Sequence, residues 1–141
     1  MTDDTALKDF IAARSHGVLA TIRRDGRPQL STITHFYDTA TDTIIASITE
    51  TRAKTKNMRR DPRVTYHVSS EDGWSYAVAE GRAELTGPAT ARDDATVEAL
   101  VDYYRRAAGE HPDWEEYRDV MVADQRVLLT IRVEKLLGLV R

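Results

Sequence analysis

The stretch that decides the fold reads HGVLATIRRDGRPQLSTIT and covers residues 16–34. It contains two runs of β-branched and apolar residues, and the dipeptide Asp25-Gly26 lies between them. Asp-Gly is favoured in tight two-residue turns, because glycine readily adopts the positive φ that such a turn requires. The stretch therefore predicts an antiparallel hairpin of two strands, residues 16–22 and residues 28–37.

Apolar periodicity along the rest of the chain predicts further strands and four helices. Val64, Tyr66 and Val68 alternate as in a strand, whereas residues 93–108 repeat apolar side chains along one helical stripe. Gly81 interrupts the longest predicted strand and indicates a bulge there. The predicted order is helix 3–14, strands 16–22, 28–37 and 43–49, helix 51–60 with Thr51 as its N-cap, strands 64–69 and 74–85, helices 93–108 and 113–123, and strand 127–137.

These elements are expected to form one domain over residues 1–141. The length suits a single core, and no linker, repeat or low-complexity segment interrupts the chain. Tight turns make the early strands antiparallel. Six strands with helices at the edges predict an α+β, mainly β fold built on a small barrel. The glycine-rich loops G-x-G-x-x-G and G-x-x-x-x-G-K-[ST] of common nucleotide-binding folds are absent from the sequence.

Composition excludes several classes of protein. The hydrophobic fraction of 41% is too high for a disordered chain. Without cysteine there is no thiolate metal site, and the four histidines show no metal-ligand spacing, so we predict no metal. No apolar run reaches the ~20 residues of a membrane span, and the N-terminal residues are polar. We therefore expect a cytoplasmic protein that does not partner with a membrane.

Charge is distributed unevenly along the chain. The net charge is −3, yet residues 52–63 carry +5 and the remainder −8. On the predicted helix, Arg52 and Lys54 fall in the first turn, where cations oppose the helix dipole. Since a bound anion would relieve this repulsion, we predict a phosphate at these residues; a solvated charged face is the alternative. The acidic remainder and the lack of interleaved aromatic residues argue against nucleic acid.

Two further groups of residues suit a flat ligand. Gln29, Ser31 and Thr32 offer neutral side chains that can bind the edge of a heterocycle, although an exposed edge strand explains the same pattern. Trp74 and Tyr76 can wall a planar ligand, or can pack in a core or subunit interface. A serine–histidine–aspartate triad has no G-x-S-x-G elbow to support it. We assign no catalytic residue.

The order and spacing of four motifs resemble a known family. The motifs are Gly17-Val-Leu-Ala-Thr21, Asp25-Gly-Arg-Pro-Gln29, Thr51-x-Arg-x-Lys-x-x-Asn57-x-x-x-Asp61-Pro-Arg63 and Trp74-Ser-x-Ala-x-x-x-Gly81. Together they are similar to the pyridoxamine 5′-phosphate oxidase-like split β-barrel family, and within it to the F420-dependent flavin/deazaflavin oxidoreductases of the B group. The resemblance covers nearly the whole chain. It implies a six-stranded split β-barrel, the FMN-binding fold, which forms a homodimer.

The resemblance also implies a cofactor site between subunits. The Arg-x-Lys pair of the basic segment would bind the cofactor phosphate, and the strand after the hairpin turn would lie along the ring system. The polyglutamate tail of F420 would meet the remaining polar residues of the basic segment, and Trp74 would come from the partner subunit. Close relatives often carry an amide where this chain has Thr32. The implied cofactor-binding residues are Gln29, Leu30, Ser31, Thr32, Arg52, Lys54, Lys56, Asn57, Arg60, Trp74 and Arg126.

The function implied is that of an F420H2-dependent reductase, in which the deazaflavin gives a hydride to a conjugated small-molecule acceptor. Two alternatives remain: an FMN-dependent oxidoreductase on the same fold, and a non-catalytic carrier of F420 or flavin. The stretch 131–138 lacks the arginine- and histidine-bearing tail of true pyridoxamine phosphate oxidases. This departure argues against the vitamin B6 reaction.

Overall fold

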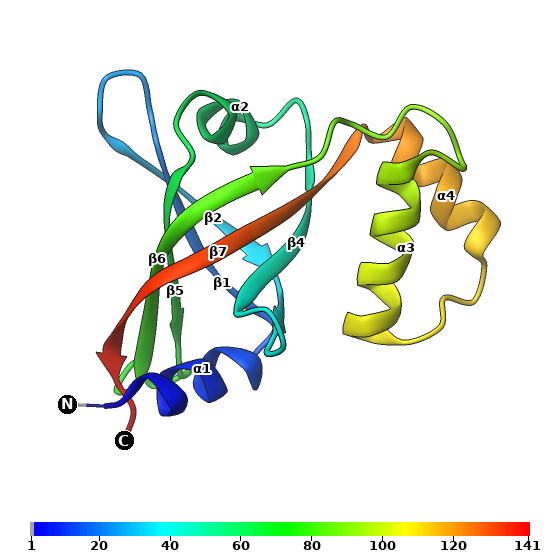
Figure 1. The fold of residues 1–141 in the computed structure, drawn as a ribbon. Coiled ribbons are helices and arrows are strands. Elements are labelled where there is room, and N and C mark those ends of the chain that lie inside the picture. Colours follow the sequence, from blue (N-terminus) through cyan, green and yellow to red (C-terminus); the bar gives the residue numbers. More distant parts are fainter. Residues whose placement is uncertain (1) are drawn as a thin grey trace.

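A computed structural model describes residues 2–141, in which a seven-stranded antiparallel sheet curls into a half-barrel (Figure 1). The order of strands in the sheet is β2-β1-β5-β6-β7-β4-β3. One helix lies at each end of the half-barrel, and two more project from its side. The elements are α1 (Asp4–Ala12), β1 (His16–Ile22), β2 (Pro28–Thr34), β3 (Phe36–Asp38), β4 (Thr43–Thr49), α2 (Ala53–Arg60), β5 (Arg63–Ser69), β6 (Tyr76–Leu85), α3 (Ala95–Ala108), α4 (Trp114–Ala123) and β7 (Arg126–Leu139).

The predicted hairpin is confirmed. β1 and β2 pair antiparallel with Thr21 opposite Gln29. The expected two-residue turn was wrong, because the Arg23 N–H donates to the Arg27 oxygen at 2.9 Å and three residues, 24–26, form the loop. Gly26 alone among them has a positive φ, of 86°. The predicted bulge is also confirmed, because the pairing of β6 with β7 shifts register between Glu80 and Gly81. A Cβ atom added at Gly81 would lie 2.1 Å from the backbone oxygen of Arg132, so glycine is required there for close packing of the two strands.

The prediction of one strand over residues 28–37 was wrong, and the sheet has seven strands instead of six. The strand ends at Thr34 and a new one starts at Phe36, because the intervening His35 turns into the interior, where only 3% of it is exposed. Its Nε2–H donates to the Ile11 oxygen at 2.9 Å, and Nδ1 lies 2.6 Å from the Tyr66 hydroxyl. At this residue the chain leaves one edge strand of the sheet, β2, and enters the other, β3.

Two separate hydrophobic cores support the fold. The first fills the half-barrel and includes Leu19, Tyr66 and Leu129, while Leu7 and Ile11 of α1 close one end. The second lies within residues 95–123, the α3–α4 lobe, where the apolar faces of the two helices meet Leu128 of β7. Since each helix buries its apolar stripe in this way, the lobe has its own core beside the barrel. No helix within residues 2–141 is long and apolar enough to cross a bilayer.

We expect His35 to make stability depend on pH between about 7 and 5.5. Burial lowers the pKa of His35, so the folded chain keeps it neutral, whereas the unfolded chain binds a proton near the ordinary histidine pKa. The free energy of unfolding should therefore fall as the pH drops, by at most about 1.4 kcal/mol per pH unit for one proton. Urea denaturation at pH 7.5, 6.5 and 5.5 measures this fall.

The matched variants are His35→Gln and His67→Gln. His35→Gln should reduce the loss of stability at low pH, because the variant lacks the buried imidazole that stays neutral in the folded chain. His67 lies exposed on β5, so His67→Gln should retain the wild-type decline. The same decline in both variants would contradict the role given to His35.

Candidate functional site

A hollow of about 390 Å³ lies where the half-barrel is split, between β2 and β4. The start of α2 borders it on one side, and α3 and β7 border it on others. Its walls offer hydroxyl groups and positive charge, and none of the residues that line it is acidic. The lining residues are Thr32, Ile33, Thr34, Ser47, Ile48, Thr49, Arg52, Lys54, Tyr103 and Arg126.

The start of α2 presents unsatisfied backbone amides and cations together. Arg52 is the N-cap, with extended backbone angles (φ −75°, ψ 151°) and no side-chain capping bond. The prediction that Thr51 caps this helix was therefore wrong. A guanidinium has no acceptor, so it cannot satisfy the free N–H groups of the first turn. An anion at this point would supply the missing acceptor.

Three cations converge on the hollow without a carboxylate in its lining. Burial lowers the pKa of Lys54, and the positive charges of Arg52 and Arg126 lower it further. Arg126 donates from Nη1 to the Ser47 oxygen at 3.3 Å. Its buried Nε makes no hydrogen bond, although the Asp124 carboxylate lies 3.5 Å away. Mutual repulsion and partial burial make this arrangement a site that favours a bound anion.

The other arginines of the basic segment are neutralised or engaged within the chain. Arg59 pairs with Glu50 at 2.9 Å, and Arg63 pairs with Asp61 at 2.7 Å. Arg60 donates to the backbone oxygen of Ile22 and to Asn57. Of the six cations within residues 52–63, the fold therefore places Arg52 and Lys54 in the lining of the hollow.

A buried polar network holds α2 against the hairpin. Asn57 is 8% exposed, and its Nδ2 donates to the Thr21 hydroxyl at 3.1 Å. That hydroxyl donates to Oε1 of Gln29 at 3.0 Å, while Oδ1 of Asn57 accepts from Arg60 at 3.3 Å. One chain of hydrogen bonds under α2 therefore runs from Gln29 through Thr21 and Asn57 to Arg60. Gln29, Asn57 and Arg60 do not line the hollow.

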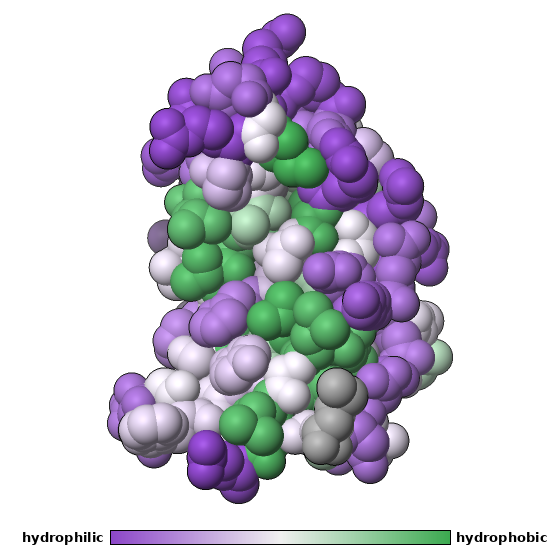
Figure 2. All heavy atoms as spheres, turned by 90° about the vertical axis from the view of Figure 1, so that its left-hand side faces the viewer, coloured by the Kyte–Doolittle hydropathy of each residue, from purple (hydrophilic) through white to green (hydrophobic). Residues whose placement is uncertain are grey.

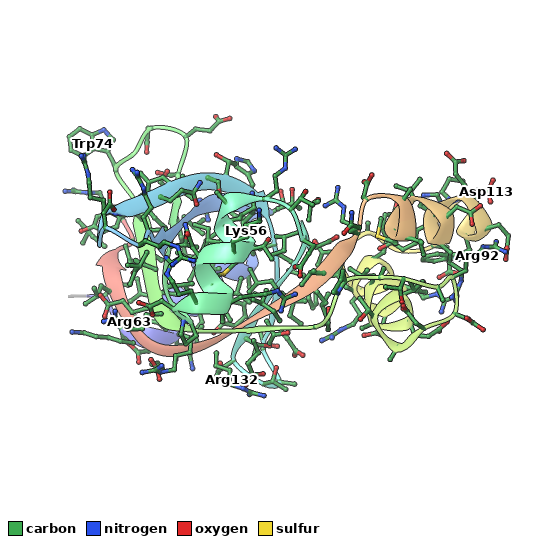
Figure 3. The ribbon with its side chains drawn as sticks, turned by 90° about the horizontal axis from the view of Figure 1, so that it is seen from above. Lys56, Arg63, Trp74, Arg92, Asp113 and Arg132 are labelled. Atoms are coloured by element: carbon green, nitrogen blue, oxygen red, sulfur yellow. The ribbon has the colours of Figure 1, made fainter. Side chains whose placement is uncertain are left out.

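The remaining predicted site residues lie apart from the hollow. Ser31 has a buried hydroxyl with no hydrogen-bond partner in the described chain, and Leu30 is 62% exposed on β2. Lys56 is exposed on α2, as Figure 3 shows. Trp74 is 66% exposed in the turn between β5 and β6, far from α2 (Figures 1 and 3). In one chain, the fold gathers only Thr32, Arg52, Lys54 and Arg126 of the predicted set.

Sequence reasoning missed several residues of the hollow. Tyr103 was missed because it lies outside the apolar stripe expected for residues 93–108, yet it is 8% exposed and faces the hollow. Thr34, Ser47 and Thr49 carry no motif. Their only signal is that they are hydroxyl residues on predicted strands.

The comparisons with known proteins bear on this fold and site. Residues 3–139 match the family model described as pyridoxamine 5′-phosphate oxidase. The chain belongs to this family. The predicted membership of the pyridoxamine 5′-phosphate oxidase-like split barrels is therefore confirmed, with the strand count corrected to seven.

Several solved structures are similar to this chain over most of its length. A conserved hypothetical protein from Mycobacterium tuberculosis has 25% identity and a TM-score of 0.74, over 98% of this chain and 84% of that one. An F420 reductase has 20% identity and a TM-score of 0.68, over 92% and 94%. A FAD-binding protein from Mesorhizobium loti has 21% identity and a TM-score of 0.68, over 97% and 92%. The latter two likenesses establish the fold alone.

We expect Asn57→Ala to lower the free energy of unfolding by about 1–3 kcal/mol, because it leaves buried partners unsatisfied. Lys56→Ala, an exposed change one position away on the same helix, should alter stability by less than about 0.5 kcal/mol. Urea denaturation of both variants measures the difference. Equal stability of Asn57→Ala and wild type would show that the network under α2 does not hold the helix.

Proposed function

We propose that this chain binds the phosphate-bearing deazaflavin F420 as a homodimer and acts as an F420H2-dependent reductase of a conjugated small molecule. The observation that carries the proposal is the convergence of Arg52, Lys54 and Arg126 on a hollow whose lining holds no carboxylate. Membership of the pyridoxamine 5′-phosphate oxidase family supports a flavin-like ligand. The resemblance to an F420 reductase supports the choice of deazaflavin.

The residues fit a phosphate at the start of α2 and a ring system along β2. Two guanidinium groups, one ammonium group and the free amides of α2 supply donors for phosphate oxygens. Along β2, Leu30 and Thr32 point to the same exposed face of the strand, and they offer an apolar side chain and a hydroxyl to a ring system. When bound, F420H2 supplies the hydride. The protein's part is to bind, to orient and to exclude water.

Lys56 favours F420 over FMN, the alternative cofactor. The polyglutamate tail of F420 would place carboxylates beyond the phosphate, and Lys56 is exposed on α2 where it can meet them. Arg60 adds nothing to this choice, because its guanidinium already binds Ile22 and Asn57. The Asn57 amide is buried and engaged too, so we leave both residues out of the proposed tail contacts.

A second copy of the chain is proposed to complete the site. The turn between β5 and β6, which carries Trp74, lies at the end of the barrel opposite α2 (Figure 1). We therefore assign Trp74 to the hollow of a partner and not to that of its own chain. Tyr76, Leu137 and Leu139 are exposed hydrophobic residues on the paired strands β6 and β7. Figure 2 shows hydrophobic patches between polar ones on this side of the barrel. A second copy seated there would cover apolar surface that is otherwise exposed to water.

Titration of the purified chain with F420 and with FMN tests the cofactor assignment, and we expect tighter binding of F420. Lys54→Ala should weaken F420 binding at least about tenfold, because a charge-assisted contact to phosphate is worth about 1.5–3 kcal/mol. Lys8→Ala removes the same charge from α1, at the other end of the barrel, and should leave affinity unchanged. Tighter binding of FMN would overturn the assignment of F420. Unchanged binding by Lys54→Ala would overturn the phosphate site.

Turnover of F420H2 with a panel of quinones, enones and tetrapyrroles tests the reductase against the carrier. A reductase should oxidise F420H2 only when chain and acceptor are both present, and should form one reduced acceptor per F420H2 consumed. Absorbance of the deazaflavin and chromatography of the acceptor measure both. Tight binding without turnover on any acceptor of the panel would favour the non-catalytic carrier.

A further inference from the structure

We infer that Tyr103 of α3 donates a hydrogen bond to the phosphate group bound in the hollow, and that the α3–α4 lobe thereby takes part in ligand recognition. This inference rests on the proposed function, since it takes the hollow as a phosphate site. It adds to that function a residue and an element that neither the motifs nor the basic segment indicate.

Tyr103 is the residue through which the lobe reaches the site. It lines the same hollow as Arg52, Lys54 and Arg126, and 8% of it is exposed. The next residue, Tyr104, packs instead against the lobe's own core, with its ring 5.2 Å from that of Tyr117. Successive side chains on a helix point about 100° apart, so Tyr103 can face the hollow while Tyr104 packs in the core of the lobe.

Within residues 2–141, the Tyr103 hydroxyl donates no hydrogen bond to another residue. It lies beside the backbone N–H of Ser47 and near the guanidinium of Arg126, neither of which can accept a proton. Burial raises the pKa of Tyr103, and these two neighbours oppose the rise without reversing it. The phenol is therefore protonated at neutral pH and available as an uncharged donor in a hollow lined by cations.

The lobe is fastened to the barrel close to this tyrosine. Arg106, one helical turn after Tyr103, donates to the Asp38 carboxylate of β3 at 2.5 Å. The guanidinium of Arg106 also lies 5.0 Å from the centre of the Phe36 ring. These contacts hold α3 against the edge of the sheet, so the phenol has a defined position relative to the hollow.

The donors of the hollow suit a phosphate better than a carboxylate. Two guanidinium groups, an ammonium group and a phenol face it, together with threonine and serine hydroxyls. A carboxylate is planar and presents both oxygens in one plane, whereas the oxygens of a phosphate group lie in a tetrahedral array that can meet donors from several sides. The phenol adds a donor without adding charge, so it strengthens binding without further repulsion among the cations.

Ligand binding to Tyr103→Phe tests the inference, with Tyr104→Phe as the matched control. Isothermal titration of the full chain would use F420, inorganic phosphate, and the deazaflavin chromophore without its phosphate side chain. Tyr103→Phe should weaken F420 and inorganic phosphate about tenfold and leave the phosphate-free chromophore unchanged. Tyr104→Phe should bind all three probes as wild type does. Melting temperatures of both variants report whether the lobe stays folded.

The outcomes separate this inference from the proposed function. Wild-type affinity for F420 in Tyr103→Phe, with a loss in Lys54→Ala, would overturn the inference and leave the phosphate site standing. Wild-type affinity in both variants would overturn the phosphate site in the hollow as well, and with it the observation that carries the proposed function. Equal weakening of the phosphate-free chromophore would assign Tyr103 a structural role and overturn the contact. In the unmodified chain, saturation with phosphate should perturb tyrosine absorption, and no perturbation would also contradict the contact.

Discussion

The split between β2 and β4 is the constraint on which the rest of the structure depends. β2 and β3 are consecutive in sequence but form opposite edges of the sheet, so the chain crosses from one edge to the other at His35. The ring of this residue is held by hydrogen bonds to Ile11 of α1 and Tyr66 of β5. Because β2 pairs with neither β3 nor β4 in the described chain, a hollow remains between β2 and β4.

The electrostatics of the hollow contrast with those of the surrounding surface. Elsewhere in the basic segment, Glu50 and Asp61 neutralise their arginines, and such exposed pairs contribute little to stability. At the split, by contrast, Lys54 is partly desolvated beside two guanidinium groups, and burial lowers its pKa. Cations held in this position, without a carboxylate in the lining, provide the electrostatic basis for the anion site proposed above.

Local patterns were reliable wherever the structure follows from near neighbours. The hairpin of β1 and β2 and the bulge at Gly81 depend on backbone conformation and close packing, so the sequence was sufficient to predict both. The strand over residues 28–37 was wrong at His35, since β propensity carries no information about a side chain that turns inward to meet Ile11 and Tyr66. The predicted N-cap, Thr51, was wrong by one residue, because Arg52 occupies the N-cap position of α2.

The sequence by itself determined the order of the elements, the basic segment and the motifs of the family, because these depend on residues close together in the chain. Only the tertiary structure decided which side chains share the hollow. Arg126 and Tyr103 are distant from Arg52 in sequence, and they reach it because β7 pairs with β4 and α3 lies against the same edge of the sheet. Periodicity reports which face of an element is buried, but the partner of that face is set by the pairing of distant strands.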